Sequence, residues 1–292
     1  MIVKDLKLKN STNINKSISE LIKNECSVLA SEYDIPQGII FRDYYRHFKT
    51  VYSVLKYYPE ENIKILDVSA GFAIPSRVLQ KMGYNISVTD SPEIAGHKIC
   101  ELHSKRFNYT PINNLETDEL PFDENSYEVI MWLATIEHIQ NSPRRILDWF
   151  YRILKPGGIL IIDTPNILDL KKRLTFLCGS SFMPDIKYIF HQKYHSGHHR
   201  EYTREDLEYV ITQCKFKMVE LSVEDTFTGL SIKEKKNKSK RDISKSYVHQ
   251  LSQYSLRWNP KYISNWLKLP YRLLLKLNSN FKDTLFAIAV KK

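Results

Sequence analysis

Residues 63–78 read IKILDVSAGFAIPSRV, and this stretch decides the fold of the chain. An apolar run ends in Asp67, a turn of small residues follows, and Pro75 suits the first turn of a helix. Strand, tight loop and helix N-terminus is the order in which α/β proteins hold nucleotide-like ligands at the carboxyl end of a strand. A second apolar strand, residues 86–89, ends in Asp90. Its two carboxylate oxygens can accept both hydroxyls of a ribose.

Strand and helix patterns alternate along the rest of the chain. Strands are predicted near residues 63–69, 85–90, 109–113, 127–133, 158–164, 216–223 and 284–290. Helices are predicted near residues 15–32, 41–57, 75–83, 92–105 and 142–154, with a further helix from Thr203. Ser142 and Pro143 favour the start of the helix at 142–154, and the sequence PGG at 156–158 predicts its end. Asp206 lies three residues after Thr203, which favours a capping box.

Four blocks of this sequence resemble the class I S-adenosylmethionine-dependent methyltransferases. Residues 63–78 and Asp90 are similar to the glycine-rich motif and the acidic residue that follows it. LPFDENSYEVIMWLATIEHI (120–139) and ILKPGGILIIDTPN (153–166) are similar to the branch that includes ubiquinone-type and many sugar and small-molecule methyltransferases, and HHREYTREDLEYVI (198–211) extends the likeness. The resemblance implies an α/β, Rossmann-like sheet, mostly parallel with an antiparallel last strand. It also implies S-adenosylmethionine as cofactor and S-adenosylhomocysteine as product.

The resemblance also implies where the cofactor lies. It assigns cofactor binding to Asp67, Ser69, Ala70, Gly71, Asp90, Ser91, Leu115, Glu116, Trp132 and Leu133. Asp67 is expected to hold the amides of its own loop or to reach the methionine amino group through water. The family usually has glycine where this chain has Ser69 and Ala73, so any positive φ angle there is costly.

The aromatic helix predicted at 41–57 precedes the first strand, where the family often roofs its site. Its aromatic residues are expected to pack on the sheet. The alternative is that Arg42, Tyr44 or Tyr45 reaches the methionine carboxylate or the acceptor.

Three histidines are the candidates for a catalytic base: His138, His198 and His199, with His195 close by in the sequence. A hydroxyl acceptor must lose its proton during methyl transfer, and a positioned histidine can take it. The alternative for each is a hydrogen-bonded surface histidine. No metal is predicted, since the His-rich loop lacks a spaced carboxylate. Leu133 to Ile136 replace the Asn/Asp-Pro-Pro-aromatic tetrad of amine-directed DNA methyltransferases, which favours an oxygen acceptor.

The chain has 292 residues and a formal net charge of +10. Residues 231–277 hold twelve Lys or Arg and two acids, so the rest of the chain is close to neutral and nucleic-acid binding is disfavoured. The four cysteines form no CxxC pair. No stretch of about 18 apolar residues and no secretory signal is apparent, so a cytoplasmic protein is expected.

Three parts are predicted: an N-terminal helical cap at 1–58, a methyltransferase domain at 59–224 with 280–292, and a basic aromatic insert or lid at 225–279. Tryptophans, leucines and cations alternate within the insert. That pattern suits a peripheral contact with the anionic inner face of a membrane. The alternatives are leucines packed on the core, or a basic channel for a phosphorylated or nucleotide-linked acceptor.

The sequence thus predicts an S-adenosylmethionine-dependent methyltransferase that acts on an oxygen of a sugar, nucleotide sugar, glycan intermediate or related small molecule. The first alternative is a quinone or lipid methyltransferase at the membrane surface. The second is a non-catalytic protein that keeps the cofactor fold for binding. Failure to bind the cofactor would favour this non-catalytic protein, whereas binding without turnover would leave it open.

Overall fold

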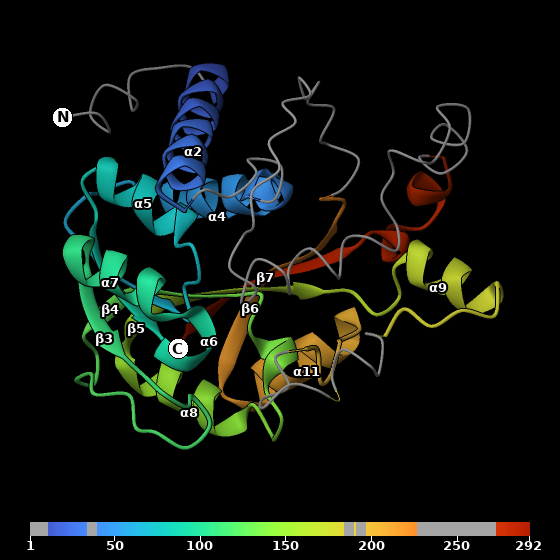
Figure 1. Ribbon diagram of the computed structural model, residues 1–292. Helices are drawn as coiled ribbons and strands as arrows, with labels where there is room; N and C mark the ends of the chain where they lie inside the picture. The colour runs from blue at the N-terminus through green and yellow to red at the C-terminus, as the bar shows by residue number, and fades with distance from the viewer. Residues whose placement is uncertain (1–10, 34–39, 184–189, 191–196, 227–272) are drawn as a thin grey trace.

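The computed structural model describes residues 11–33, 40–183, 190, 197–226 and 273–292, and its centre is a seven-stranded sheet (Figure 1). The strands are β1 (Lys64–Val68), β2 (Asn85–Asp90), β3 (Asn108–Pro111), β4 (Tyr127–Leu133), β5 (Leu154–Pro165), β6 (Phe216–Glu224) and β7 (Thr284–Lys291). Their order is β3-β2-β1-β4-β5-β7-β6. The pairs from β3 to β5 are parallel, whereas β7 is antiparallel to both of its neighbours. The predicted Rossmann-like sheet with an antiparallel last strand is confirmed.

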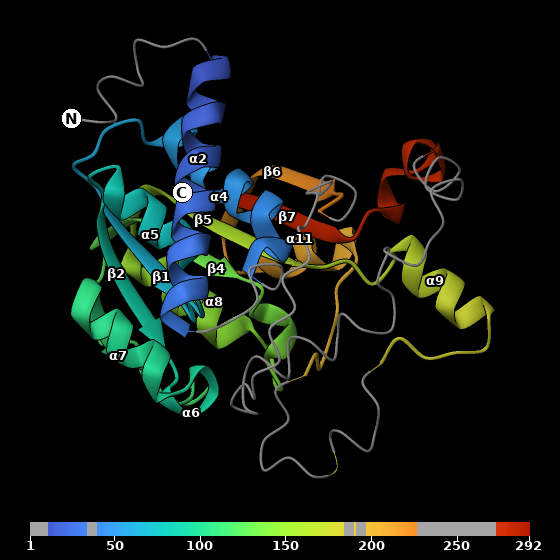
Figure 2. The same ribbon diagram turned by 45° about the horizontal axis from the view of Figure 1, so that its top comes forward.

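Helices cover both faces of the sheet. The longer ones are α2 (Ser11–Tyr33), α4 (Tyr44–Tyr57), α5 (Ile74–Lys81), α7 (His97–Arg106), α8 (Arg144–Ile153), α9 (Leu170–Leu177) and α11 (Arg204–Gln213). The short ones are η1 (Phe41–Asp43), α6 (Pro92–Ala95), η2 (Ile136–His138) and η4 (Ser279–Phe281). Residues of α2, α4 and α5 share one hydrophobic cluster with the sheet, and residues of α8 and α11 share the other. In Figure 2, α2 and α4 lie in front of the sheet and α8 lies behind it.

Strand residues alternate between these two clusters, as the two-residue repeat of a strand requires. In β4, Met131 belongs to the cluster under α2, α4 and α5, and Trp132 belongs to the cluster under α8 and α11. The core is therefore split by the sheet, and the carboxyl edge of the parallel strands is left for the site.

Helix α4 and the turn before it pack several aromatic residues on the core as expected, Phe41 and Tyr44 among them, although the fully buried positions of the helix are others. Its buried residues are Thr50, Val51, Ser53 and Val54. Phe48 packs against the core while partly buried, but Tyr52 is 42% exposed. The Tyr45 hydroxyl donates to Glu224 Oε2 at 3.3 Å, which ties α4 to the edge strand β6.

Three helix boundaries differ from the sequence prediction. α2 begins at Ser11, earlier than expected. The helix expected at 92–105 is divided by Gly96, whose φ of 89° and ψ of 147° are not helical. α8 ends at Ile153, so Gly157 and Gly158 lie inside β5 rather than at the helix end. A Cβ on Gly158 would lie 2.8 Å from the Lys155 carbonyl oxygen, so close packing requires this glycine.

Two predicted helix starts are seen in the hydrogen bonds. The Thr203 side chain accepts from the Asp206 amide at 3.0 Å, and the Asp206 side chain accepts from the Thr203 amide at 3.2 Å, so the capping box is confirmed. The Ser142 hydroxyl accepts from the Arg144 amide at 3.3 Å, although Pro143 occupies the N-cap position.

Most of the basic insert, residues 227–272, lies outside the described residues. Its flanks are joined: the Thr226 amide and hydroxyl each donate to the Asp283 carboxylate at 2.9 Å. The predicted domain bounds remain predictions. Among the described helices, none has the length and hydropathy needed to cross a membrane.

Candidate active site

Asp90 ends β2 at the carboxyl edge of the sheet and is 6% exposed. Its Oδ2 accepts from the Gly71 amide at 2.7 Å, and its Oδ1 accepts from the Ser91 amide at 2.9 Å. A carboxylate offers about four lone-pair sites, so each oxygen can accept a further donor. The arrangement fits the two hydroxyls of a ribose, which is the role predicted for Asp90.

The loop after β1 is left-handed at three positions. The φ angle is 57° at Ser69, 55° at Gly71 and 51° at Ala73. A residue with a Cβ atom loses about 1–2 kcal/mol in this conformation. Serine and alanine therefore hold the loop at an energetic cost that glycine would avoid. Ala70 connects the loop to β2, because its amide donates to the Thr89 carbonyl at 3.1 Å.

Asp67 contacts the helix that follows its loop rather than the loop amides. Its Oδ2 accepts from the Ser76 hydroxyl at 2.5 Å. The donor to Asp67 is therefore a side chain of α5 and not the expected loop amide. The Asp67 side chain is 2% exposed, and this burial raises the pKa of Asp67 to about 7. Burial thus favours the protonated form of this carboxyl.

Glu116 anchors a neighbouring loop. Its carboxylate accepts from the amides of Gln140 at 3.0 Å and Asn141 at 2.8 Å. Burial opposes ionisation there, but these hydrogen bonds keep the pKa of Glu116 below its usual value. Leu115 packs against the cluster under α8 and α11. That the two residues contact adenine remains a prediction.

At the end of β4, the polar groups that could contact the cofactor belong to the backbone and not to the side chains. The Trp132 side chain is fully buried and packs edge-on against Phe150, with ring centroids 5.1 Å apart. The Leu133 carbonyl accepts from the Thr135 hydroxyl at 2.9 Å. Only the backbone of these residues is therefore available for the predicted contact with the methionine amino group.

A buried ion pair that the sequence did not reveal lies beside this backbone. Arg46 Nη2, from α4, lies 2.5 Å from Asp163 Oδ1, near the end of β5. The same Asp163 oxygen accepts from the Ala134 amide at 2.9 Å. Asp163 is 1% exposed, and burial raises its pKa even though Arg46 opposes this shift. The residues singled out from the sequence were Arg42, Tyr44 and Tyr45, one to four positions earlier on the same segment.

The Arg46–Asp163 pair keeps unused hydrogen-bonding capacity. Within the described part of the chain, Arg46 Nε and Asp163 Oδ2 are buried and have no hydrogen-bond partner. Buried polar atoms without partners are rare in native proteins and call for an explanation. The pair thus keeps one unused donor and one unused acceptor, which suit the carboxylate and the ammonium group of an amino acid. The residues present therefore fit the methionine end of S-adenosylmethionine.

Two of the three candidate histidines come together. The rings of His138 and His198 have centroids 5.0 Å apart and meet edge-on. His138 Nδ1 lies 3.1 Å from the Gly197 carbonyl oxygen, and His198 Nδ1 lies 2.8 Å from Glu201 Oε1. The side chain of His199 is exposed, and its amide donates to the Glu137 carbonyl at 2.8 Å. His195 lies outside the described residues.

The same histidines lie beside a carboxylate that the sequence argument overlooked. Glu137, His138 and His198 each offer one ligand atom, and these atoms lie within 4.8 Å of one another. Glu137 Oε2 also accepts from the Thr164 hydroxyl at 2.9 Å. The carboxylate judged missing from the His-rich loop is supplied by the residue before His138. The group has the donor types of a transition-metal site, while the prediction of no metal remains untested.

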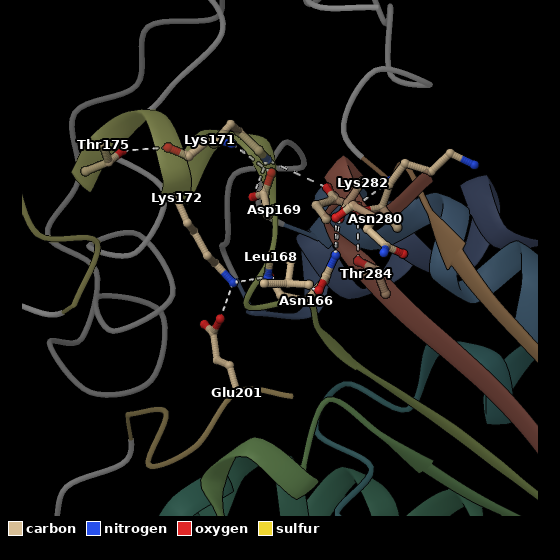
Figure 3. A network of polar contacts seen from close by, with 12 residues as sticks. Asn166, Leu168, Asp169, Lys171, Lys172, Thr175, Glu201, Asn280, Lys282 and Thr284 are labelled. Atoms are coloured by element: carbon tan, nitrogen blue, oxygen red, sulfur yellow. Dashed lines mark hydrogen bonds and ion pairs between the residues drawn. The ribbon is translucent and has the colours of Figure 1, made fainter. Parts of the chain in front are cut away.

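Glu201 links His198 to the end of the sheet through Lys172 of α9, and Figure 3 shows the Glu201–Lys172 contact. Its second oxygen pairs with Lys172 from α9, and the Lys172 ammonium also donates to the Asn166 carbonyl at 2.8 Å. The Asn166 side chain donates to the carbonyls of Asn280 and Lys282, both at 2.8 Å. Glu201 is 9% exposed, and despite burial its pKa is lowered by His198 and Lys172. It is therefore ionised beside His198.

Comparisons with known proteins agree with the fold described above. A family model described as a methyltransferase domain matches residues 36–221. Among curated proteins, a ubiquinone biosynthesis O-methyltransferase of Rickettsia typhi is 32% identical over 138 residues, covering 44% of this chain and 52% of that protein. A mitochondrial protein of the same description from Dictyostelium discoideum is 27% identical over 155 residues, covering 48% and 45%. The match spans about half the length of these relatives.

Solved structures show the same fold. An S-adenosylmethionine-dependent methyltransferase from Methanosarcina mazei aligns with a TM-score of 0.50 at 15% identity, covering 82% of this chain and 97% of that one. A candidate sarcosine dimethylglycine methyltransferase from Galdieria sulphuraria aligns with a TM-score of 0.51 at 13% identity, covering 85% and 86%. The resemblance drawn from the sequence is confirmed, and with it S-adenosylmethionine as the cofactor. The chain belongs to the methyltransferase-domain family, in the class I S-adenosylmethionine-dependent group.

Proposed function

We propose that this protein is an O-methyltransferase in which His198 takes the proton of a hydroxyl acceptor. The observation that carries the proposal is the contact between His198 Nδ1 and the buried, ionised Glu201. A carboxylate can only accept a hydrogen bond, so the His198 proton lies on Nδ1 and Nε2 becomes the basic nitrogen.

The cofactor supplies a methyl group already activated on a sulfonium, so alignment of the acceptor accounts for much of the rate. In this proposal Asp90 holds the ribose, and Arg46 with Asp163 holds the amino-acid end. His198 accepts the acceptor proton as the new oxygen–carbon bond forms. Glu201 then stabilises the imidazolium at the distance seen here, 2.8 Å.

Two observations bear on the class of acceptor. The sequence resemblance favours a hydroxyl of a sugar, a nucleotide sugar, a glycan intermediate or a related small molecule. The curated relatives described above are ubiquinone biosynthesis O-methyltransferases, which favours a ring hydroxyl of a quinone precursor. We give the phenolic acceptor priority, and an acceptor of that kind would fit the proposed contact with an anionic membrane. Cosedimentation stronger with anionic than with neutral vesicles would support the membrane contact, and equal binding would remove it.

The test has two stages. Calorimetric titration of the purified chain with S-adenosylhomocysteine is expected to show binding, and its absence from folded protein would favour a non-catalytic role. Methyl transfer to phenolic and sugar hydroxyls is then followed by mass spectrometry, with and without a chelator that would reveal a metal at Glu137, His138 and His198. His198→Ala is expected to lower kcat by about 10²- to 10⁴-fold, the usual contribution of a general base.

The matched control is His97→Ala, because His97 is exposed at the start of α7. It is expected to keep the parent rate. Equal rates for the His198 and His97 variants would refute the assignment of the base without affecting the cofactor assignment.

A further inference from the structure

The peptide groups on both sides of Gly71 are held by side chains from other elements. The Gly71 amide donates to Asp90 Oδ2 at 2.7 Å, and the Gly71 carbonyl oxygen lies 2.9 Å from His103 Nε2. Asp90 ends β2, and His103 lies in the last turn of α7. The central residue of the cofactor loop is therefore fixed from two directions.

His103 is placed for this contact by its surroundings. The side chain is 5% exposed, and its ring contacts the rings of Phe107 and Tyr109, with centroid distances of 5.9 and 5.8 Å. Tyr109 also donates from its hydroxyl to the Asp90 carbonyl at 3.3 Å. A carbonyl oxygen can only accept, so Nε2 of His103 carries the proton. The same nitrogen lies 3.9 Å from Asp90 Oδ2, the oxygen that receives the Gly71 amide.

The loop needs such support because two of its left-handed residues are not glycine. Ser69 at φ 57° and Ala73 at φ 51° flank Gly71 and favour other backbone conformations. Strained conformations persist only where the surrounding structure determines them. The hydrogen bonds that Gly71 receives from His103 and donates to Asp90 supply that constraint, because Gly71 lies between Ser69 and Ala73.

We propose that His103 is a positioning residue for the cofactor: it fixes the Gly71 peptide and thereby holds the loop of residues 69–73 and the ribose-binding Asp90 in the binding geometry. The proposal rests on the cofactor site of the proposed function. It adds a residue from α7 that does not touch the cofactor but sets the shape of the loop that does. It also explains how the loop keeps this shape with one glycine among its three left-handed positions.

The test compares His103→Leu with His103→Gln in the full chain, titrated with S-adenosylhomocysteine. Leucine fills the pocket but has no donor, whereas the glutamine amide can place an N–H near the position of Nε2. The leucine variant is expected to bind about tenfold more weakly, which corresponds to about 1.4 kcal/mol, the upper range for one neutral hydrogen bond. The glutamine variant is expected to bind within about threefold of the parent. Equal affinity of both variants, at the parent level or below it, would overturn the proposal.

A second measurement does not depend on the cofactor. Hydrogen exchange of the peptide covering residues 63–78 is followed in the ligand-free protein. It should be faster in the leucine variant and unchanged in the glutamine variant. If the leucine variant does not fold, Ser69→Gly is added to it, because glycine removes part of the strain and should restore protection. A parent protein that does not bind S-adenosylhomocysteine would refute the proposed function, while parent-like exchange in the leucine variant would refute the role of His103.

Discussion

Arg46 of α4 and Asp163 of β5 meet as a buried ion pair across 117 residues of sequence. The contact brings the N-terminal helices to the carboxyl edge of the sheet, where the loop after β1 and Asp90 also lie. The side chains are 17% and 1% exposed, so each depends on the other for its charge to be tolerated. The N-terminal helices are thus part of the candidate site as well as of the core.

Arg46→Met should lower the free energy of unfolding by about 3 kcal/mol, because it leaves the Asp163 carboxylate buried without its cation. Urea unfolding at neutral pH measures the change. Lys56→Met is the control on the same helix, since Lys56 is half exposed and lies 3.4 Å from Glu220. Its expected effect is about 0.5 kcal/mol or less. Similar losses in the two variants would show that the Arg46 pair is no more important than a surface contact.

Asp67→Asn should flatten the dependence of stability on pH. Burial raises the pKa of Asp67 from 3.8 to about 7, so the folded protein binds this proton more tightly than the unfolded chain does. The resulting stability is complete below about pH 4 and is lost as pH rises towards 7, on the order of 4 kcal/mol in all. Asparagine keeps an oxygen for the Ser76 hydroxyl but does not titrate. Urea unfolding from pH 5 to 8 should show the parent losing more stability than the variant, and parallel curves would contradict the prediction.

Ser69→Gly and Ala73→Gly should each stabilise the protein by about 1 kcal/mol, because glycine adopts the left-handed backbone without a Cβ clash. Ala30→Gly in the last turn of α2 is the control, and it should destabilise by about 1 kcal/mol because glycine is a poor helix former and the buried Ala30 methyl group is lost. Thermal and urea unfolding provide the comparison. Loss of stability in all three variants would mean that the loop angles are not strained in solution.

The sequence predicted the sheet because each of its signals is local. The apolar runs that end near Asp67 and Asp90 mark strands and their carboxyl ends without reference to the rest of the chain. Helix starts were predicted for the same reason, as at Thr203, where the cap lies three residues from its partner. Gly96 divides a helix that the sequence predicts as continuous, because its positive φ is not helical. The helical pattern continues on both sides of Gly96, so the sequence does not reveal the break.

The site was predicted less completely because its contacts are long-range. Arg46 follows the residues singled out on its segment, but only the packing of α4 shows that this cation faces Asp163. Glu201 lies in the same segment as two candidate histidines, but its contacts with His198 and with Lys172 of α9 are visible only in the fold. For both Arg46 and Glu201, the available signal in the sequence was a charged residue within two positions of a predicted site residue. The acceptor pocket could not be derived this way, since the residues that distinguish phenolic from sugar acceptors carry no motif of their own.

Glu25→Ala should weaken the attachment of α2 to the rest of the domain. The Glu25 side chain is 1% exposed and lies 2.7 Å from Arg77 and 3.3 Å from Arg106, and Arg77 is itself 5% exposed. Removing the carboxylate leaves a buried guanidinium without its main partner, so the free energy of unfolding should fall by about 3 kcal/mol. Glu101→Ala is the control, because its pair with Lys105 lies on the surface and should contribute nothing measurable. Hydrogen exchange should rise in α2 before it rises in β4, since α2 contacts the sheet through α4 and α5 while β4 lies at its centre. If α2 and β4 exchanged together in the Glu25 variant, the helix would be an inseparable part of the core rather than a layer attached through this ion pair.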